Sequence, residues 1–383
     1  MNISDKAHNL KPSGIRAFFD LVMGSKDILS LGVGEPDFVT PWNIRESAIY
    51  SIEKGYTSYT SNKGHEELRK ELSHFLKKKY NAAYHYDNEI LITVGVSEGL
   101  DLSLRAIINP GDKVLIPEPC YVSYEPLVTL AGGIPVLVST KEKDGFKIPP
   151  ETLKKEIEKG IKAVLFNYPS NPTGMSYSEK EIQEIARIID KHDAYIISDE
   201  TYDELTYDFT HTSLCSFPRI KEKLIYLNGF SKTYAMTGWR VGYVCGSEDI
   251  VNAMTKIHQY TIMCVNTPSQ LAAITALKHS QNDVSYMKKE YDMRRHYVVK
   301  RLNEIGLKCH MPDGAFYAFP SIKKTGMSSM EFCKKLLKKE KVAVVPGNAF
   351  GDSGEGNIRI SYASSIERLK EALNRIEQFL MRL

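Results

Sequence analysis

Short β-rich runs alternate with amphipathic helical patterns from Glu89 to Cys245, and few folds accommodate such an alternation. It is typical of α/β proteins, in which helices cover a central sheet. The runs are EILITV (89–94), KVLIP (113–117), PVLVST (135–140), AVLFNY (163–168), AYIISD (194–199), KLIYLNGF (223–230) and RVGYVCG (240–246). The sequence therefore predicts an α/β sheet in this part of the chain.

One of the intervening helices has a clear start signal. Ser178 and Glu181 have the spacing of a capping box, which satisfies two backbone N–H groups at a helix start. Apolar residues then recur at helical spacing, at Ile182, Ile185, Ala186 and Ile189. We expect this face of the helix to pack against the sheet.

The pattern changes after a predicted helix over residues 284–305. Strand-like runs follow at 314–322, 342–346 and 357–363, and a capped helix begins near Ser364. A chain of 383 residues also exceeds what one hydrophobic core usually supports. We therefore expect a second, smaller α+β unit. The first 45 or so residues carry no strong strand signal.

Charge and cysteine content exclude several classes of partner. Lys and Arg total 50 against 47 Asp and Glu, and the net charge of +3 is spread along the chain, so nucleic acid is not an expected partner. No apolar run approaches the length of a membrane span. The cysteines lack metal-binding spacing, so we expect no metal site and a reducing, cytoplasmic location. They are Cys120, Cys215, Cys245, Cys264, Cys309 and Cys333.

Polar and reactive residues follow the predicted strands. In open α/β sheets, ligands bind beyond the carboxyl ends of the strands. These ends carry Gly95, the segments 117–121 and 167–174, Asp199, and Ser231 with Lys232. We therefore expect a ligand site at this edge of the sheet.

Three of these signals suggest chemistry, and each has a structural alternative. Lys232 follows an apolar strand, where burial and Arg240 would lower its pKa and make it a Schiff-base former; alternatively it is a surface lysine. Asp199 ends an apolar strand, where a buried carboxylate needs a cationic partner such as a protonated pyridine nitrogen; alternatively, it caps a helix or turn. Residues 95–99 join a strand to a helix predicted to start near Ser97. The backbone N–H groups at this helix start would bind phosphate; alternatively, the segment is an ordinary helix start without a ligand.

Taken together, the segments resemble one family. The chain is similar over nearly its full length to class I and II aminotransferases, which are pyridoxal 5'-phosphate (PLP) enzymes of fold type I. The segments that carry the resemblance are SLGVGEPDF (30–38), GYTSYTSNKGHEELR (55–69), TVGVSEG (93–99), PEPCYVSY (117–124), YPSNPTG (168–174), SDETYDEL (198–205), GFSKTYAMTGWRVGY (229–243), GAFY (314–317) and GNIRISYA (356–363).

The resemblance implies a fold and a reaction. The fold is a large PLP-binding domain with a mostly parallel seven-stranded sheet over residues 45–283, and a smaller α+β domain from residues 1–44 and 284–383. The reaction is transamination between an L-amino acid and a 2-oxo acid by a ping-pong mechanism, with glutamate and 2-oxoglutarate as one pair. A homodimer with shared active sites is expected.

The resemblance also assigns roles to individual residues. Lys232 would carry PLP as a Schiff base and Asp199 would pair with its pyridine nitrogen. The other cofactor contacts implied are Tyr202 and Asn171 at the phenolic oxygen, Tyr121 on the ring, and Val96, Ser97, Ser231, Arg240 and the partner subunit's Tyr59 at the phosphate. Arg359 would bind the substrate α-carboxylate, with Asn171 and the Gly34 backbone close by.

Some alternatives stay open. Glu98 stands where the family often has Gln, which puts an acid near the phosphate unless its side chain turns outward. A PLP-dependent carbon–sulfur lyase would share the same residues, whereas a PLP-binding regulator would need an additional DNA-binding module. The candidate amino donors are aromatic amino acids, aspartate and N-acetyl-LL-2,6-diaminopimelate. Ile15, Arg16 and Phe18 are candidates for a lid, or they belong to an ordinary amphipathic helix.

Overall fold

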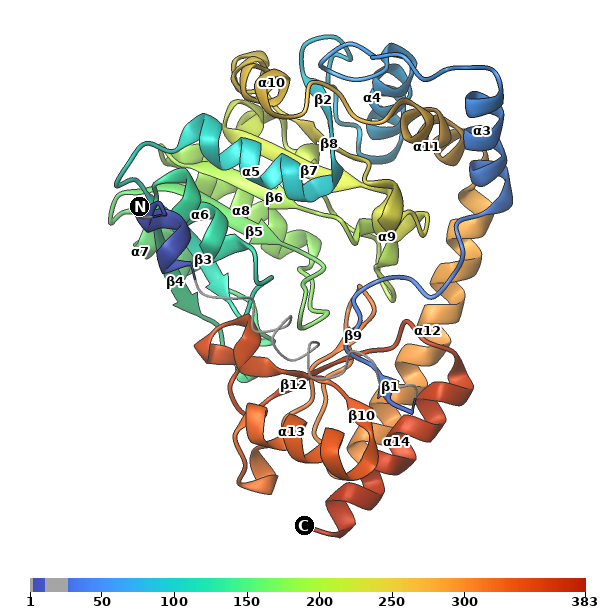
Figure 1. The fold of residues 1–383 in the computed structure, drawn as a ribbon. Helices are drawn as coiled ribbons and strands as arrows, with labels where there is room; N and C mark the ends of the chain where they lie inside the picture. Colours follow the sequence, from blue (N-terminus) through green and yellow to red (C-terminus); the bar gives the residue numbers. More distant parts are fainter. Residues whose placement is uncertain (1–2, 11–26) are drawn as a thin grey trace.

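A seven-stranded sheet forms the centre of the larger part of the protein in the computed structural model, which describes residues 3–10 and 27–383 (Figure 1). The strand order is β2-β8-β7-β6-β5-β3-β4. Strand β8 is antiparallel to both of its neighbours, and every other pair is parallel. The strands are β2 (Ile90–Thr93), β3 (Lys113–Glu118), β4 (Ile134–Ser139), β5 (Ile161–Asn167), β6 (Tyr195–Asp199), β7 (Leu224–Gly229) and β8 (Gly242–Cys245). The predicted α/β sheet is confirmed, with small shifts at the strand ends.

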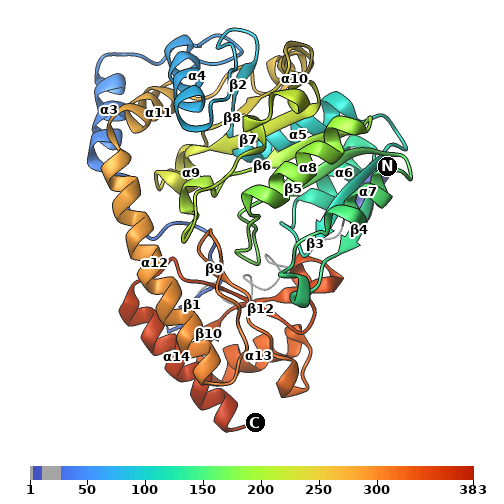
Figure 2. The ribbon, with the colours of Figure 1, turned by 180° about the vertical axis from the view of Figure 1, so that it is seen from behind.

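Helices cover both faces of this sheet (Figures 1 and 2). One face packs against α5 (Gly95–Ile107) and α6 (Tyr124–Ala131), and the other against α7 (Pro150–Ile157) and α8 (Glu179–Lys191). Successive strand residues point to opposite faces, so Ile196 joins the core beneath α8 and Ile197 joins the core beneath α5. The predicted capping box of Ser178 and Glu181 is present at the start of α8.

The remaining helices of the larger part lie around the edge formed by β2. Helix α10 (Glu248–Thr261) packs on α5, while α11 (Thr267–His279) packs on α3 (Trp42–Glu53) and α4 (Glu66–Tyr80). A single helical turn, α9 (Phe230–Thr233), follows β7 directly. Near the N-terminus lies the short helix α1 (Asp5–Asn9).

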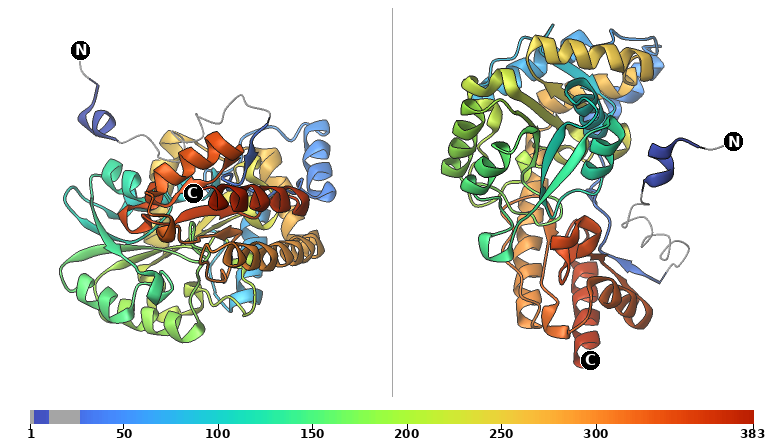
Figure 3. Two further views of the ribbon diagram at one scale, coloured as in Figure 1. Left: turned by 90° about the horizontal axis from the view of Figure 1, so that it is seen from below. Right: turned by 90° about the vertical axis from the view of Figure 1, so that its left-hand side faces the viewer.

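A smaller unit lies below the larger one in the side view of Figure 3. It contains the three-stranded antiparallel sheet β11-β12-β9 and the parallel pair β1-β10. Helix α12 (Gln281–Glu304) runs from the larger unit into the smaller one, where α13 (Ser329–Glu340) and α14 (Ile366–Met381) pack. The strands are β1 (Leu29–Ser30), β9 (Tyr317–Ala318), β10 (Val342–Ala343), β11 (Val345–Pro346) and β12 (Ile358–Ser361).

Several predicted elements of the smaller unit differ from the observed ones. The run at 314–322 forms a ladder only at Tyr317 and Ala318, because Ala315 has a φ of +58° and Pro320 has no N–H to donate. The predicted strand at 342–346 is divided: β10 pairs with β1, whereas β11 pairs with β12. Strand β1 itself was not predicted. In the larger unit, helix α5 also differs from its prediction, because it begins at Gly95 rather than near Ser97.

Among the helices of residues 3–10 and 27–383, none combines the length and the hydropathy that crossing a bilayer demands.

Candidate active site

A cavity of about 700 Å³ lies where the carboxyl ends of the parallel strands face the smaller unit. Both units contribute to its walls, since Asp199 and Lys232 come from the larger one and Tyr317 and Arg359 from the smaller one. Most of the predicted site residues line it. These are Gly34, Val96, Ser97, Tyr121, Asn171, Asp199, Tyr202, Ser231, Lys232, Arg240 and Arg359.

Lys232 projects into this cavity from α9, the turn that follows β7. Its half-buried Nζ donates a 2.6 Å hydrogen bond to the carbonyl oxygen of Gly34. The pKa of this amine is lowered from 10.5 to about 8, chiefly by burial and also by the positive charges of Arg359 and Arg240, while the negative charges of Glu35 and Asp199 oppose the shift. Near neutral pH, a larger fraction of this amine is therefore uncharged than in a lysine with the ordinary pKa of 10.5. The uncharged amine is the form that attacks an aldehyde.

Asp199 ends strand β6 and is buried at the base of the cavity. Its Oδ1 accepts hydrogen bonds from the backbone N–H (3.2 Å) and the hydroxyl (2.7 Å) of Thr201, and its Oδ2 accepts one from the Tyr124 hydroxyl (2.8 Å). Burial raises the pKa of this carboxyl, while these hydrogen bonds oppose the shift. Within the described parts of the chain, no cationic side chain forms an ion pair with Asp199. A cationic ligand atom would therefore be stabilised beside it.

The N-terminus of α5 and the guanidinium of Arg240 form one end of the cavity. Gly95 has a φ of +68°, and a Cβ at this position would lie 2.6 Å from Nη2 of Arg240. Arg240 itself has a φ of +54°, and its Nη1 donates to the carbonyl oxygen of Thr237. Val96 and Ser97 open into the cavity in the first turn of α5, where backbone N–H groups lack helical partners. This arrangement suits a phosphate group.

Glu98 turns away from the cavity. Its Oε2 accepts a hydrogen bond from the backbone N–H of Val94, and its Oε1 lies 2.7 Å from Nδ1 of His258 on α10. His258 is fully buried. The carboxylate that departs from the common family pattern is thus used to hold the start of α5 against α10, and the predicted conflict with a phosphate does not arise.

Arg359 reaches the cavity from β12. Its Nη1 donates to Oδ1 of Asn171 (2.8 Å) and its Nη2 to the carbonyl oxygen of Gly32 (2.6 Å). The guanidinium carbon lies 4.5 Å from the centre of the Tyr317 ring. Burial lowers the pKa of Arg359, and its Nε has no hydrogen-bond partner in the described structure. Because no carboxylate of the described residues pairs with it, this buried cation is available to an anionic ligand.

Two backbone carbonyls lie beside the cationic groups of the cavity. Gly34, which was predicted to lie near the substrate carboxylate, lines the cavity, and its carbonyl oxygen accepts from Lys232; the carbonyl oxygen of Gly32, which was not predicted as a site residue, accepts from Arg359. Two tyrosines were also missed as site residues. Tyr317 forms a 2.8 Å hydrogen bond with the Tyr202 hydroxyl, and Tyr124 bonds to Asp199. Tyr317 ends the segment GAFY and Tyr124 ends the segment PEPCYVSY. Their membership of segments that carry the family resemblance was the available signal.

Tyr59 lies outside the cavity of its own chain. Its side chain is 81% exposed in the loop between α3 and α4. The suggested lid residues, Ile15, Arg16 and Phe18, lie outside the described residues.

The residues of the cavity fit pyridoxal 5'-phosphate. The amine of Lys232 suits the aldehyde, the unpaired carboxylate of Asp199 suits a protonated pyridine nitrogen, and the N-terminus of α5 with Arg240 suits the phosphate. Gly95 keeps the phosphate end open, because a side chain there would meet Arg240.

Comparisons with known proteins agree with this chemistry. The family model described as aminotransferase class I and II matches residues 26–376. The chain is 53% identical over 378 residues to a putative aminotransferase, YugH, of Bacillus subtilis (99% of this chain, 98% of the relative). It is 46% identical over 383 residues to an aspartate aminotransferase of Pyrococcus abyssi (99% and 98%). A solved aromatic aminotransferase from Pyrococcus horikoshii superimposes with a TM-score of 0.91 at 44% identity (96% and 99%).

Proposed function

Because the chain belongs to the class I and II aminotransferases, which use pyridoxal 5'-phosphate, we propose that it transfers amino groups from an L-amino acid to a 2-oxo acid by a ping-pong mechanism. Glutamate and 2-oxoglutarate form one substrate pair in this proposal. The observation that carries it is that Asp199 and Arg359, both buried in the cavity that holds Lys232, form no ion pair with any side chain of residues 3–10 and 27–383.

Each of these residues has a separate task in the proposed reaction. Bound PLP supplies an aldehyde that joins to amines and a ring that takes up electrons from the substrate Cα. The amine of Lys232 would hold the cofactor through its aldehyde. Once the substrate amine has displaced it, the same amine would be free to take the Cα proton and to return it as an acid. Its lowered pKa supports this role, since a base that works near neutral pH has a pKa near that range.

Asp199 and Arg359 control which bond reacts. Asp199 would hold the proton on the pyridine nitrogen of bound PLP, and the protonated ring would stabilise negative charge that develops at Cα. Arg359 binds the α-carboxylate and thereby orients the Cα–H bond for removal. Asn171 accepts from Arg359 through Oδ1, which leaves its amide nitrogen to donate to the phenolic oxygen of the cofactor together with the Tyr202 hydroxyl.

The residues that line the cavity favour an order among the candidate amino donors. Within the described residues, the cationic side chains that line it are Lys232, Arg240 and Arg359, each of which already has a proposed role. Tyr121 is already assigned to the cofactor ring, and the remaining wall includes Val33, Val122 and Tyr317, which suit an aromatic side chain. We therefore place aromatic amino acids first among the candidate donors, ahead of aspartate and N-acetyl-LL-2,6-diaminopimelate.

We further propose that the enzyme is a cytoplasmic homodimer with shared active sites. Exposed apolar side chains lie on α3, in the loop that contains Tyr59, and at the end of α10 with the two residues after it, and together they are called the apolar surface. Its members are Trp42, Ile49, Tyr50, Ile52, Tyr56, Tyr59, Tyr260, Ile262 and Met263. A second copy of the chain would cover this surface and bring Tyr59 to the partner's phosphate group. All six cysteines are free thiols, which supports the cytoplasmic location.

The visible absorbance of the purified holoenzyme tests the proposed reaction. Addition of phenylalanine, tyrosine, aspartate, glutamate or N-acetyl-LL-2,6-diaminopimelate is expected to bleach the band of the Lys232-bound cofactor, and 2-oxoglutarate to restore it. The rank of the amino acids by bleaching rate gives donor preference. Release of pyruvate and ammonia from a cysteine-type substrate without any oxo acid would instead identify a carbon–sulfur lyase. A Lys232→Ala protein, which retains the fold but lacks the amine, is the negative control.

A further inference from the structure

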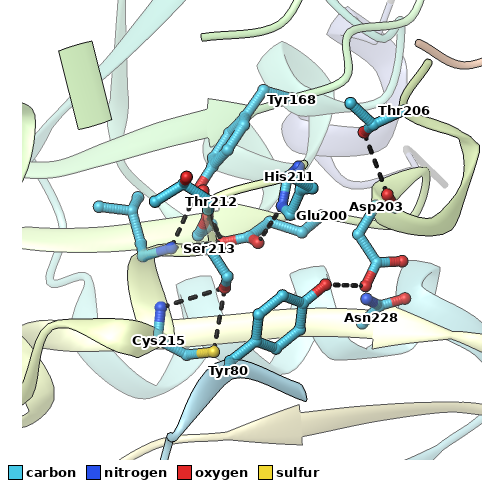
Figure 4. Close-up of polar contacts among 12 residues, drawn as sticks. Tyr80, Tyr168, Glu200, Asp203, Thr206, His211, Thr212, Ser213, Cys215 and Asn228 are labelled. Carbon is cyan, nitrogen blue, oxygen red and sulfur yellow. Dashed lines mark hydrogen bonds and ion pairs between the residues drawn. The ribbon is translucent and has the colours of Figure 1, made fainter. Parts of the chain in front are cut away.

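The segment that follows β6 presents different side chains to its two sides. Asp199 and Tyr202 line the cavity, whereas the buried residues Glu200 and Asp203 do not. Figure 4 shows Glu200 and Asp203 among the polar side chains that surround them. Asp203 accepts hydrogen bonds from the Tyr80 hydroxyl (2.5 Å) and from Nζ of Lys79 (3.0 Å). The proposed mechanism assigns no task to the two rear carboxylates.

Glu200 is the more completely enclosed of the two and accepts several hydrogen bonds. Its Oε1 accepts from the Tyr168 hydroxyl (3.0 Å), the Ser198 hydroxyl (2.8 Å) and the backbone N–H of Leu214 (3.2 Å). Its Oε2 lies 2.7 Å from Nε2 of His211. The side chain of Glu200 has no exposed surface. A carboxylate with this many fixed donors has one orientation available to it.

The partners of Glu200 are also held in place. The His211 ring stacks on Tyr168 with 5.0 Å between ring centres and 25° between planes. The Tyr168 hydroxyl accepts a further hydrogen bond from the N–H of Leu214 (2.9 Å). Glu200 therefore joins the end of β6 to the end of β5, where Tyr168 lies, and to the chain near Leu214.

Backbone hydrogen bonds connect the residues that Glu200 contacts to two residues of the cavity, Asp199 and Asn171. The carbonyl oxygen of Asp199 accepts from the amide of Asn167 (2.9 Å) and the N–H of Tyr168 (3.3 Å), and Oδ1 of Asn167 accepts from the N–H of Asn171 (3.0 Å). The backbone of Asp199 and the turn that carries Asn171 are thus fixed to the residues that Glu200 holds. A shift at Glu200 would move both groups relative to a bound cofactor.

We propose that Glu200 is a positioning residue for transamination: from outside the cavity, it sets the orientation of Asp199 and of the Asn171 turn through its bonds to Tyr168, Ser198, Leu214 and His211. The inference rests on the proposed function, because it concerns how the cavity residues meet PLP and substrate. Small displacements of reacting groups reduce rates strongly, so a residue that touches neither ligand can still determine kcat.

Glu200→Ala and Glu200→Gln, purified as holoenzymes, test this inference. We expect Glu200→Ala to lower kcat roughly tenfold and to change the visible circular dichroism of the bound cofactor without substrate, because the ring meets a displaced Asp199. Glu200→Gln keeps the shape and an acceptor oxygen, so both kcat and the dichroism should return close to the parent values. Glu340→Ala, which removes another buried glutamate remote from the cavity, should leave both unchanged.

Tyr168→Phe keeps the test decisive if Glu200→Ala does not fold. It removes one donor to Glu200 and keeps the ring that stacks on His211, so we expect about a threefold loss of kcat and a dichroism change in the same direction. Folded Glu200→Ala protein with parental kcat and dichroism would overturn the inference, as would parental values for Tyr168→Phe when Glu200→Ala is insoluble. A parent protein without transaminase activity would contradict the proposed function, and the dichroism of the variants would still report on positioning.

Discussion

Arg359 and Asn171 meet through a 2.8 Å hydrogen bond, although they come from different units of the fold and are 188 residues apart in sequence. Arg359 belongs to β12 in the smaller unit, and Asn171 to the turn after β5 in the larger one. The proposed carboxylate site therefore exists only when the two units are in contact. Substrate binding and the relative position of the units are expected to be linked.

Replacement of Arg359 by lysine tests the carboxylate site. Lysine keeps the positive charge but cannot form a two-point contact with a carboxylate, so kcat/KM for the amino donor is expected to fall roughly a hundredfold, mainly through KM. Arg375→Lys is the matched control, because Arg375 pairs with Glu371 on the surface of α14. Steady-state kinetics with the preferred donor provide the measurement. An unchanged KM would exclude Arg359 as the carboxylate ligand.

The central sheet could be predicted from the sequence because its strands are apolar, separated by helical patterns and flanked by polar residues. Strand β1 could not, since Leu29–Ser30 is too short for an alternation signal and depends on pairing with Val342 and Ala343 far along the chain. The strand predicted at 314–322 in the smaller unit was too long for a similar reason. The positive φ of Ala315 interrupts it, and residue composition does not reveal this backbone conformation.

The candidate site was predictable to the extent that its residues belong to recognisable segments. Lys232, Asp199 and Arg359 could be assigned in this way, and the structure brings them to one cavity. Tyr124 could not, because its role depends on a hydrogen bond to a carboxylate 75 residues away. The contact of the Gly32 carbonyl oxygen with Arg359 likewise depends on the path of the backbone.

The lowered pKa of Lys232 predicts a pH dependence of stability in the apoenzyme. Between about 8 and the ordinary value of 10.5, the unfolded chain binds a proton at this lysine that the folded chain does not, so the free energy of unfolding should rise with pH across this window. Lys232→Met removes this contribution. We expect the Tm difference between variant and parent apoenzyme to favour the variant most below pH 8 and to shrink as the pH rises. A Tm difference that does not vary with pH would contradict a lowered pKa.

The pair formed by Glu98 and His258 predicts a cofactor-affinity effect. Glu98→Ala should weaken PLP binding severalfold and lower stability by about 1 kcal/mol, because it removes the acceptor for the Val94 N–H at the start of α5 and leaves His258 buried without this partner. Glu98→Gln retains an acceptor and should bind PLP nearly as tightly as the parent. The measurements are PLP titration of apoenzyme and thermal unfolding. Equal PLP affinity in Glu98→Ala would remove the proposed link to the phosphate site.

Tyr59 provides the test of the shared active site. If its hydroxyl contacts the phosphate of the partner's cofactor, Tyr59→Phe should raise the Kd of PLP about tenfold, because a hydrogen bond to a charged group is lost. Light scattering should report a dimer for parent and variant alike. Tyr260→Phe, which changes another exposed tyrosine of the same apolar surface, should keep the parental Kd.

Mixed dimers decide which subunit Tyr59 serves. In a hybrid of a Tyr59→Phe subunit and a Lys232→Ala subunit, the site with intact Lys232 receives an intact Tyr59 only if that tyrosine crosses the interface. We then expect the hybrid to bind PLP at this site with parental affinity and to be active at limiting PLP. If Tyr59 acts within its own chain, the same site carries the Phe substitution and its affinity stays weak. Because the same hybrid is expected to bind PLP tightly in the first case and weakly in the second, its measured affinity reports the direction in which Tyr59 reaches.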